Sequence, residues 1–194
     1  MEQKNKFIYI LPVMFGFFIM GFCDLVGISV TYAKEQFQWT ETQAGFLPSM
    51  VFLWFFILSV PTAMLMNRIG RKNTVLLSML FTFAGMVLPF IDFSETSCYV
   101  AFALLGIGNT ILQVSLNPLL ANVVQGKGLT SSLTAGQFVK AISSFVGPLL
   151  AGYCSAVLGN WALMFPIYAV VTLISSAWLF LTPIQREKVE GETS

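Results

Sequence analysis

Two ionisable residues, Asp24 and Lys140, lie inside long apolar runs of the sequence. A charge in an apolar, membrane-like setting is costly, and such residues commonly mark the path of a substrate or ion. Their depths along the two runs differ by about 10 Å at the rise of an α-helix. Either the two residues line one polar path, or they act separately. In the second case Lys140 extends its stem toward a polar surface and Asp24 bonds to a neighbouring helix.

A second group of polar residues has the spacing of one helical face. Asn109, Gln113 and Asn117 recur every four residues, which places the three side chains on one side of a helix. Carboxamides both donate and accept hydrogen bonds, which suits the alternating hydroxyls of a sugar. The alternative is that they join neighbouring helices through hydrogen bonds. Both interpretations stay open.

Gln137, Lys140 and Ser144 form a similar polar face one segment later, and the segment around Asp24 adds Thr31. Three polar faces in one protein predict a single hydrophilic cavity. The candidate substrate path therefore consists of Asp24, Asn109, Gln113, Asn117, Gln137, Lys140 and Ser144.

The composition is that of a membrane protein. Hydrophobic residues make up 56% of the chain and charged residues 10%, with a mean hydropathy of +0.79; a soluble domain has about 25% charged residues. A net charge of +1 gives no excess of positive charge for binding nucleic acid. The three cysteines lack metal-ligand spacing, histidine is absent, and no nucleophile–base set or nucleotide-binding loop is present. We therefore expect no enzyme activity, no cofactor and no metal.

Six segments are long and apolar enough to cross a bilayer, since a spanning helix needs about 20 residues. They cover residues 7–32, 42–66, 74–91, 98–122, 133–158 and 161–182. The connections are short, so neighbouring helices must run antiparallel. We expect an all-α membrane protein with one six-helix bundle over residues 1–184 and a polar, disordered tail over 185–194.

Lysine and arginine are distributed unevenly between the two ends of these segments. One end carries only Lys34. The other end carries Lys4, Lys6, Arg68, Arg71, Lys72, Lys127, Arg186 and Lys188. Because basic loops stay in the cytoplasm, both termini are expected to be cytoplasmic. The protein is expected to be a multi-pass protein of the plasma (inner) membrane.

The turn between the second and third segments has a recognisable pattern. Residues 63–72 resemble the loop between helices 2 and 3 of major facilitator superfamily transporters, Gly-x-x-x-Asp-Arg-x-Gly-Arg-Arg/Lys, with Ala63 in place of the first glycine. The resemblance implies one half of a major facilitator fold. It also implies a conformational latch on the inner helix ends, formed here by Asn67, Arg68, Gly70, Arg71 and Lys72, with Asn67 replacing the aspartate.

Residues 108–118 and 137–140 are similar to helices 4 and 5 of the fucose–proton symporter family, which includes glucose/galactose transporters. By that pattern Gln113 stands where the family has an acid, Gln137 keeps a sugar-facing glutamine, and Lys140 replaces an asparagine. The proton-linked aspartate of the family falls on Gly27, with Asp24 nearby. The resemblance implies a secondary transporter of a sugar-type solute, with Asp24 as the ion-coupling candidate.

Gly147 and Pro148 partly resemble an element of drug–proton antiporters and are expected to bend their helix. Half of a drug–proton antiporter is thus one alternative; a non-transporting assembly partner or degenerate half-transporter is another. Whole transporters of this type have two six-helix halves with the site between them. We therefore expect an N-terminal half whose partners are a small solute, the lipid bilayer, and a second half or a second copy in a homodimer, with no nucleic acid.

Overall fold

The computed structural model describes residues 2–126 and 128–185, with side chains from Phe7 onward. The side chains of Lys4 and Lys6 lie outside the described part. So do Lys127, Arg186, Lys188 and the predicted tail beyond Gln185.

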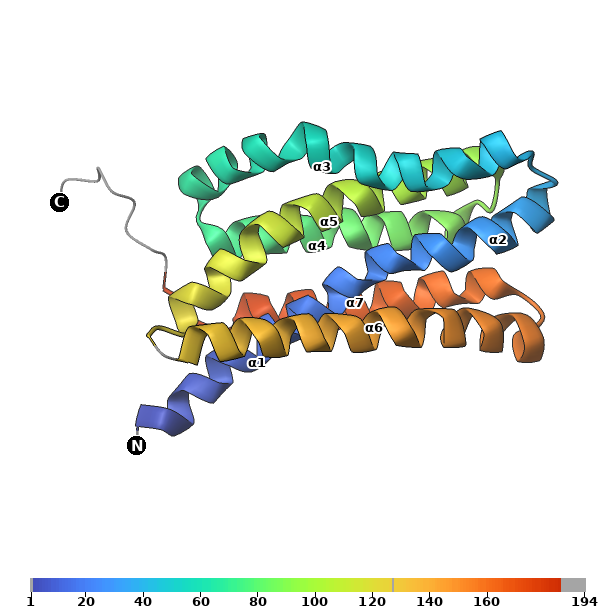
Figure 1. The fold of residues 1–194 in the computed structure, drawn as a ribbon. Helices are drawn as coiled ribbons and strands as arrows, with labels where there is room; N and C mark the ends of the chain where they lie inside the picture. Colours follow the sequence, from blue (N-terminus) through green and yellow to red (C-terminus); the bar gives the residue numbers. More distant parts are fainter. Residues whose placement is uncertain (1, 127, 186–194) are drawn as a thin grey trace.

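The described residues form an all-helical bundle (Figure 1). The first span contains α1 (Glu2–Met20), the 3₁₀ turn η1 (Gly21–Asp24) and α2 (Leu25–Phe37). The remaining elements are α3 (Glu41–Ile69), α4 (Arg71–Ile91), α5 (Glu95–Val123), α6 (Gly128–Leu158), the 3₁₀ turn η2 (Trp161–Leu163) and α7 (Met164–Leu181). Six helical segments are long and apolar enough to cross a membrane, which confirms the fold class expected from the sequence.

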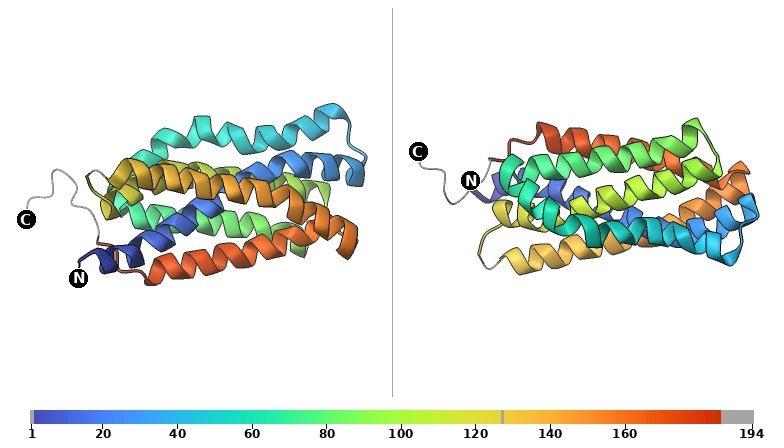
Figure 2. Two further views of the ribbon diagram at one scale, coloured as in Figure 1. Left: turned by 60° about the horizontal axis from the view of Figure 1, so that its bottom comes forward. Right: turned by 90° about the horizontal axis from the view of Figure 1, so that it is seen from above.

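The helices run side by side along one long axis, and consecutive spans alternate in direction (Figures 1 and 2). The start of α1, the α3–α4 turn and the end of α7 lie together at the end that holds Arg68, Arg71 and Lys72, called here the basic end. The α2–α3 and α4–α5 connections lie at the opposite, acidic end, with Glu35 and Glu95.

Helix α5 is the most buried of the spans that consist of one unbroken helix. It packs against α4 and α3, and 61% of its most apolar stretch is buried, against 11% for α3 and 22% for α6. Glycine permits the close approach of α3: a Cβ on Gly106 would lie 2.5 Å from the backbone oxygen of Val51. Helices α3 and α6 are therefore the least enclosed of the spans that the structure describes.

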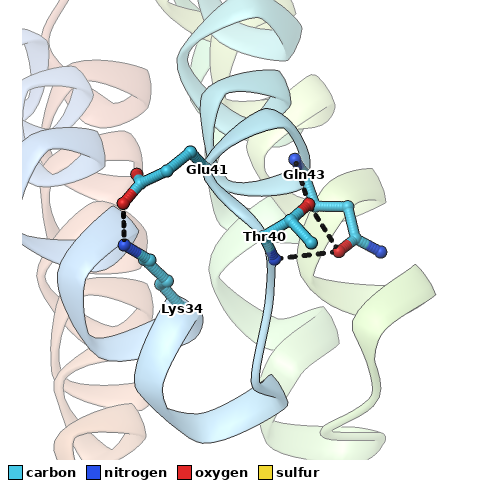
Figure 3. Close-up of polar contacts among 4 residues, drawn as sticks. All are labelled: Lys34, Thr40, Glu41 and Gln43. Carbon is cyan, nitrogen blue, oxygen red and sulfur yellow. Dashed lines mark hydrogen bonds and ion pairs between the residues drawn. The ribbon is translucent and has the colours of Figure 1, made fainter.

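The hairpin between α2 and α3 is fixed by local hydrogen bonds (Figure 3). Gln38 adopts a left-handed conformation with φ 55°, which ends α2. Thr40 then caps α3: its hydroxyl accepts a bond from the backbone N–H of Gln43 at 3.3 Å, and the Gln43 side chain accepts one from the Thr40 N–H at 3.0 Å. An ion pair between Lys34 and Glu41 spans the same turn.

The sequence of the first span suggests one continuous α-helix. The structure instead shows an interruption at η1. Gly21 allows this turn to lie directly on α6, because a Cβ there would lie 2.8 Å from the backbone oxygen of Lys140 and 2.6 Å from the Cβ of Ser143. A short 3₁₀ stretch inside a long helix often marks a functional or strained position. Here it brings the candidate charge Asp24 against the helix that carries Lys140.

Candidate functional site

Asp24 and Ser144 form the centre of the candidate site. Asp24 is the last residue of η1, and its carboxylate accepts a hydrogen bond of 2.5 Å from the Ser144 hydroxyl on α6. The same hydroxyl lies 3.0 Å from the backbone oxygen of Lys140. A serine hydroxyl has one proton to donate, so the carboxylate and the carbonyl compete for it.

Lys140 lies in the same neighbourhood without pairing directly with Asp24. Among the described side chains no ion pair joins the two residues. Both residues lie near Cys23, which is buried next to Asp24 in the 3₁₀ turn. We call Asp24, Lys140 and Ser144 the Asp24 cluster. The structure therefore links Asp24 to α6 through Ser144, one turn after Lys140, and the bond to Lys140 involves its backbone oxygen, not its charged group.

The Asp24 cluster lies on an open face of the bundle. Asp24 is exposed, whereas Lys140 and Ser144 are half-buried. Gln137, one turn before Lys140 on α6, is exposed as well. A Cβ added to Gly27, one turn after Asp24, would meet no atom within 4 Å. A solute or a second protein body can therefore reach these groups without displacing a helix.

The carboxamide stripe on α5 lies deeper. Asn109 is only 2% exposed, and neither atom of its carboxamide has a hydrogen-bond partner among the described residues. It lies next to Cys23, without the geometry of a hydrogen bond. Gln113 and Asn117 are half-buried, and the Asn117 carbonyl oxygen is likewise buried without a described partner. Hydrogen bonds between helices therefore do not account for Asn109.

Two cations of the basic turn hold the ends of other helices. Arg71 donates to the backbone oxygen of Pro118 at 3.0 Å and to the side-chain oxygen of Asn122, near the end of α5. Lys72 donates to the backbone oxygens of Phe180 at 2.9 Å and Thr182 at 2.7 Å, at the end of α7. Cations at helix C-termini satisfy carbonyls that lack partners within the helix. Arg71 and Lys72 thus connect α4 to α5 and α7.

The remaining predicted residues lie in the basic turn and in α6. Asn67 and Arg68 lie exposed in the last turn of α3. Gly70 has a φ of 87°, which favours glycine, and permits the sharp turn into α4. Gly147 packs against Leu25, and Pro148 lies inside an uninterrupted α6. A bend at Gly147 and Pro148 stays a prediction.

The sequence interpretation did not include the close contact of Gly21 with Ser143 and the Lys140 backbone on α6. The available signal was the pair Gly21 and Gly27 on either side of a charge in an apolar run. Within the described residues, no group of three or more histidine, cysteine, aspartate or glutamate side chains could hold a metal ion. The site is a set of hydrogen-bonding groups on an open helical face.

Comparison with solved structures shows the same fold in transporters. The structure superposes on the proton:xylose symporter XylE bound to 6-bromo-6-deoxy-D-glucose with a TM-score of 0.81 and 15% identity, covering 95% of this chain and 46% of that one. A mutant of the peptide transporter POT in complex with sulfate gives a TM-score of 0.76 and 16% identity, covering 90% of this chain and 37% of that one.

Two curated relatives are similar in sequence. They are glucose/galactose transporters of Brucella abortus, from biovar 1 (strain 9-941) and from strain 2308, each 28% identical over 153 residues. The matched region covers 76% of this chain and 37% of each relative. The chain thus spans well under half the length of the curated relatives that it matches. The pattern of the Major Facilitator Superfamily matches residues 10–194, and the chain belongs to that family.

Proposed function

We propose that this chain is one half of a secondary transporter for a sugar-type solute. Membership of the Major Facilitator Superfamily supports secondary transport at a general level, and the curated relatives are described as glucose/galactose transporters. The observation that carries the proposal is the Asp24 cluster, a charged and hydrogen-bonded group on an open face at a break in the first span. Such discontinuous helices commonly form solute sites near the middle of transporters.

The chemistry of the surrounding groups suits a neutral polyol. Ser144 and Lys140 supply donors, Asp24 supplies an acceptor, and Gln137 supplies both from an exposed position. Asn109 adds a buried carboxamide whose donors and acceptor are unused. Gln113 and Asn117 continue the path toward the basic end on the same helix face.

A second six-helix body completes the path in this proposal. The Asp24 cluster is open on one side, and α3 and α6 are the least enclosed helices. The matched relatives are more than twice as long as the region they share with this chain. The second body is either a second half or a second copy of this chain. We infer from the excess of basic residues that the basic end and both termini face the cytoplasm and that the membrane is the plasma (inner) membrane.

Asp24 is the proposed coupling residue. When the carboxylate is charged it attracts the Ser144 proton, and when it is protonated the hydroxyl is free to donate to the Lys140 carbonyl. Protonation would thus alter the contact between η1 and α6. The Asn67–Lys72 turn acts in gating, because Arg71 and Lys72 hold the ends of α5 and α7.

The test is uptake of labelled D-glucose and D-galactose by proteoliposomes. One preparation holds the chain alone. The other holds a chimera with the part of the Brucella relative that follows the matched region. If the chimera takes up hexose and the unfused chain does not, the chain is a half-transporter. If the unfused chain also takes up hexose, a second copy of it completes the path. Asp24→Asn, Lys140→Met and Asn109→Leu should each reduce uptake about tenfold or more, whereas Ser49→Ala on the exposed side of α3 should not. Absence of hexose uptake in both preparations would refute the proposal.

A further inference from the structure

A cavity lies at the acidic end, apart from the Asp24 cluster. It has a volume of about 470 Å³ and lies between the end of α2, the α4–α5 connection and the turn into η2. Cavities of about 300–1,000 Å³ are typical of small-molecule sites. Its polar lining includes Tyr32, Glu35, Gln36, Ser155, Asn160 and Trp161.

Trp161 gives this cavity a rigid aromatic wall and an unused donor. Its ring stacks on Tyr32 with centroids 5.5 Å apart and meets the edge of Phe93 at 5.7 Å. The side chain is only 5% exposed, yet its indole N–H has no hydrogen-bond partner among the described residues. A buried tryptophan N–H usually finds a partner.

The remaining groups combine donors with acceptors. The side-chain oxygen of Asn160 accepts from the backbone N–H of Ala162 at 2.9 Å, which leaves its amide N–H₂ available. Gln36 and Ser155 add a carboxamide and a hydroxyl. Glu35 is exposed and acts as an acceptor, because the nearby Lys34 is paired with Glu41 (Figure 3).

These features favour one class of ligand. An anion would be repelled by Glu35, the one charged side chain among the described residues that line the cavity. A cation would need an open aromatic face, but the facing rings of Tyr32 and Trp161 are stacked on each other. A neutral ring with several hydroxyls fits the mixed donors and acceptors.

We propose that this cavity binds a hexose at the acidic end before the sugar reaches the Asp24 cluster. The inference rests on the proposed function for the identity of the ligand and for the outward orientation of this end. It makes the acidic end a capture site and separates initial binding from the transport step.

Equilibrium dialysis of labelled D-galactose against the full chain tests the inference. The chain is held in nanodiscs of phosphatidylglycerol and phosphatidylethanolamine, so that no sugar headgroup competes. Ser155→Phe fills the cavity and should abolish the cavity-dependent binding. Glu35→Gln removes the charged acceptor and should weaken the affinity about tenfold. Matched controls at the same end are Thr42→Phe and Glu95→Gln, neither of which lines the cavity.

Two outcomes separate this inference from the proposed function. Galactose binding that survives Lys140→Met and is lost in Ser155→Phe supports the cavity site, even if the chimera takes up no hexose. Binding that is unchanged in Ser155→Phe, or that is absent once Lys140 is replaced, overturns it. If circular dichroism shows that Ser155→Phe does not fold, the galactose affinities of Glu35→Gln and Glu95→Gln are compared instead. Equal affinities of these two variants overturn the inference.

Discussion

The Ser144 hydroxyl on α6 donates a hydrogen bond to the Asp24 carboxylate at the break of the first span. This bond links two segments that are 120 residues apart in sequence. It is a side-chain hydrogen bond between the first span and the polar face of α6.

A double-mutant cycle with Ser144→Ala and Asp24→Asn should show a coupling of about 1 kcal/mol. Hydrogen bonds to charged groups are worth about 1.5–3 kcal/mol, and the exposure of Asp24 reduces the value. Chemical unfolding in bicelles provides the measurement. Ser49→Ala, whose hydroxyl bonds only within α3, should be additive with Asp24→Asn. Additivity of the Ser144 pair would show that the bond contributes nothing to stability.

Gly21→Ala should destabilise the bundle by about 1–3 kcal/mol, since overpacking has costs of that size. The added Cβ would lie 2.8 Å from the Lys140 backbone oxygen, which cannot move without moving α6. Gly27→Ala is the matched control in the same span, with no atom within 4 Å of the new Cβ. It should be neutral or stabilising by up to about 1 kcal/mol. Thermal unfolding of both variants in nanodiscs gives the sign, and equal midpoints would contradict the close contact at Gly21.

Asn109→Leu should leave stability unchanged or raise it by about 1–2 kcal/mol. A buried carboxamide without partners is costly, and an apolar side chain of similar size removes that cost. Hexose uptake by the chimera should fall in the same variant, because the unused donors and acceptor are lost. Asn73→Leu, at an exposed position near the basic end, should change stability by less than about 0.5 kcal/mol. A clear fall in the unfolding temperature of Asn109→Leu would mean that Asn109 is structural.

Lys72→Met should loosen the end of α7. Two backbone oxygens there, those of Phe180 and Thr182, would lose their charged donor, at a cost of about 1–2 kcal/mol. Hydrogen exchange should rise at the end of α7 and stay unchanged at the acidic end. Lys34→Met removes an exposed ion pair with Glu41 and should cost less than about 1 kcal/mol. Unchanged exchange near Thr182 would contradict the anchoring role of Lys72.

The fold was predictable because each span must satisfy its backbone hydrogen bonds within lipid. Length and hydropathy alone therefore locate six helices. Their polar ends extend further than the apolar runs: α4 begins at Arg71 because Gly70 supplies the turn, and α3 begins at Glu41 because Thr40 caps it. Such caps follow from residue types that hydropathy does not weigh.

The site was only partly predictable. The positions of Asp24 and Lys140 in apolar runs were visible in the sequence, but their link through Ser144 depends on where η1 meets α6. The four-residue period of the carboxamides placed Asn109 on a face without showing that it is the most buried of the three. The acidic-end cavity joins Tyr32 with Trp161 from opposite ends of the chain, and no local pattern encodes that approach.

The contact of Gly21 with Lys140 has a mechanical consequence. Because a Cβ at Gly21 would lie within 2.8 Å of both the Ser143 side chain and the Lys140 backbone oxygen, almost no space separates the two segments, and we expect them to tilt together. The part of the first span that follows Asp24 has open space around Gly27. This part can rotate about the contact between Gly21 and α6. A force applied to the Asp24 carboxylate is thus delivered to α6 directly, whereas the outer arm of the first span absorbs the remaining displacement.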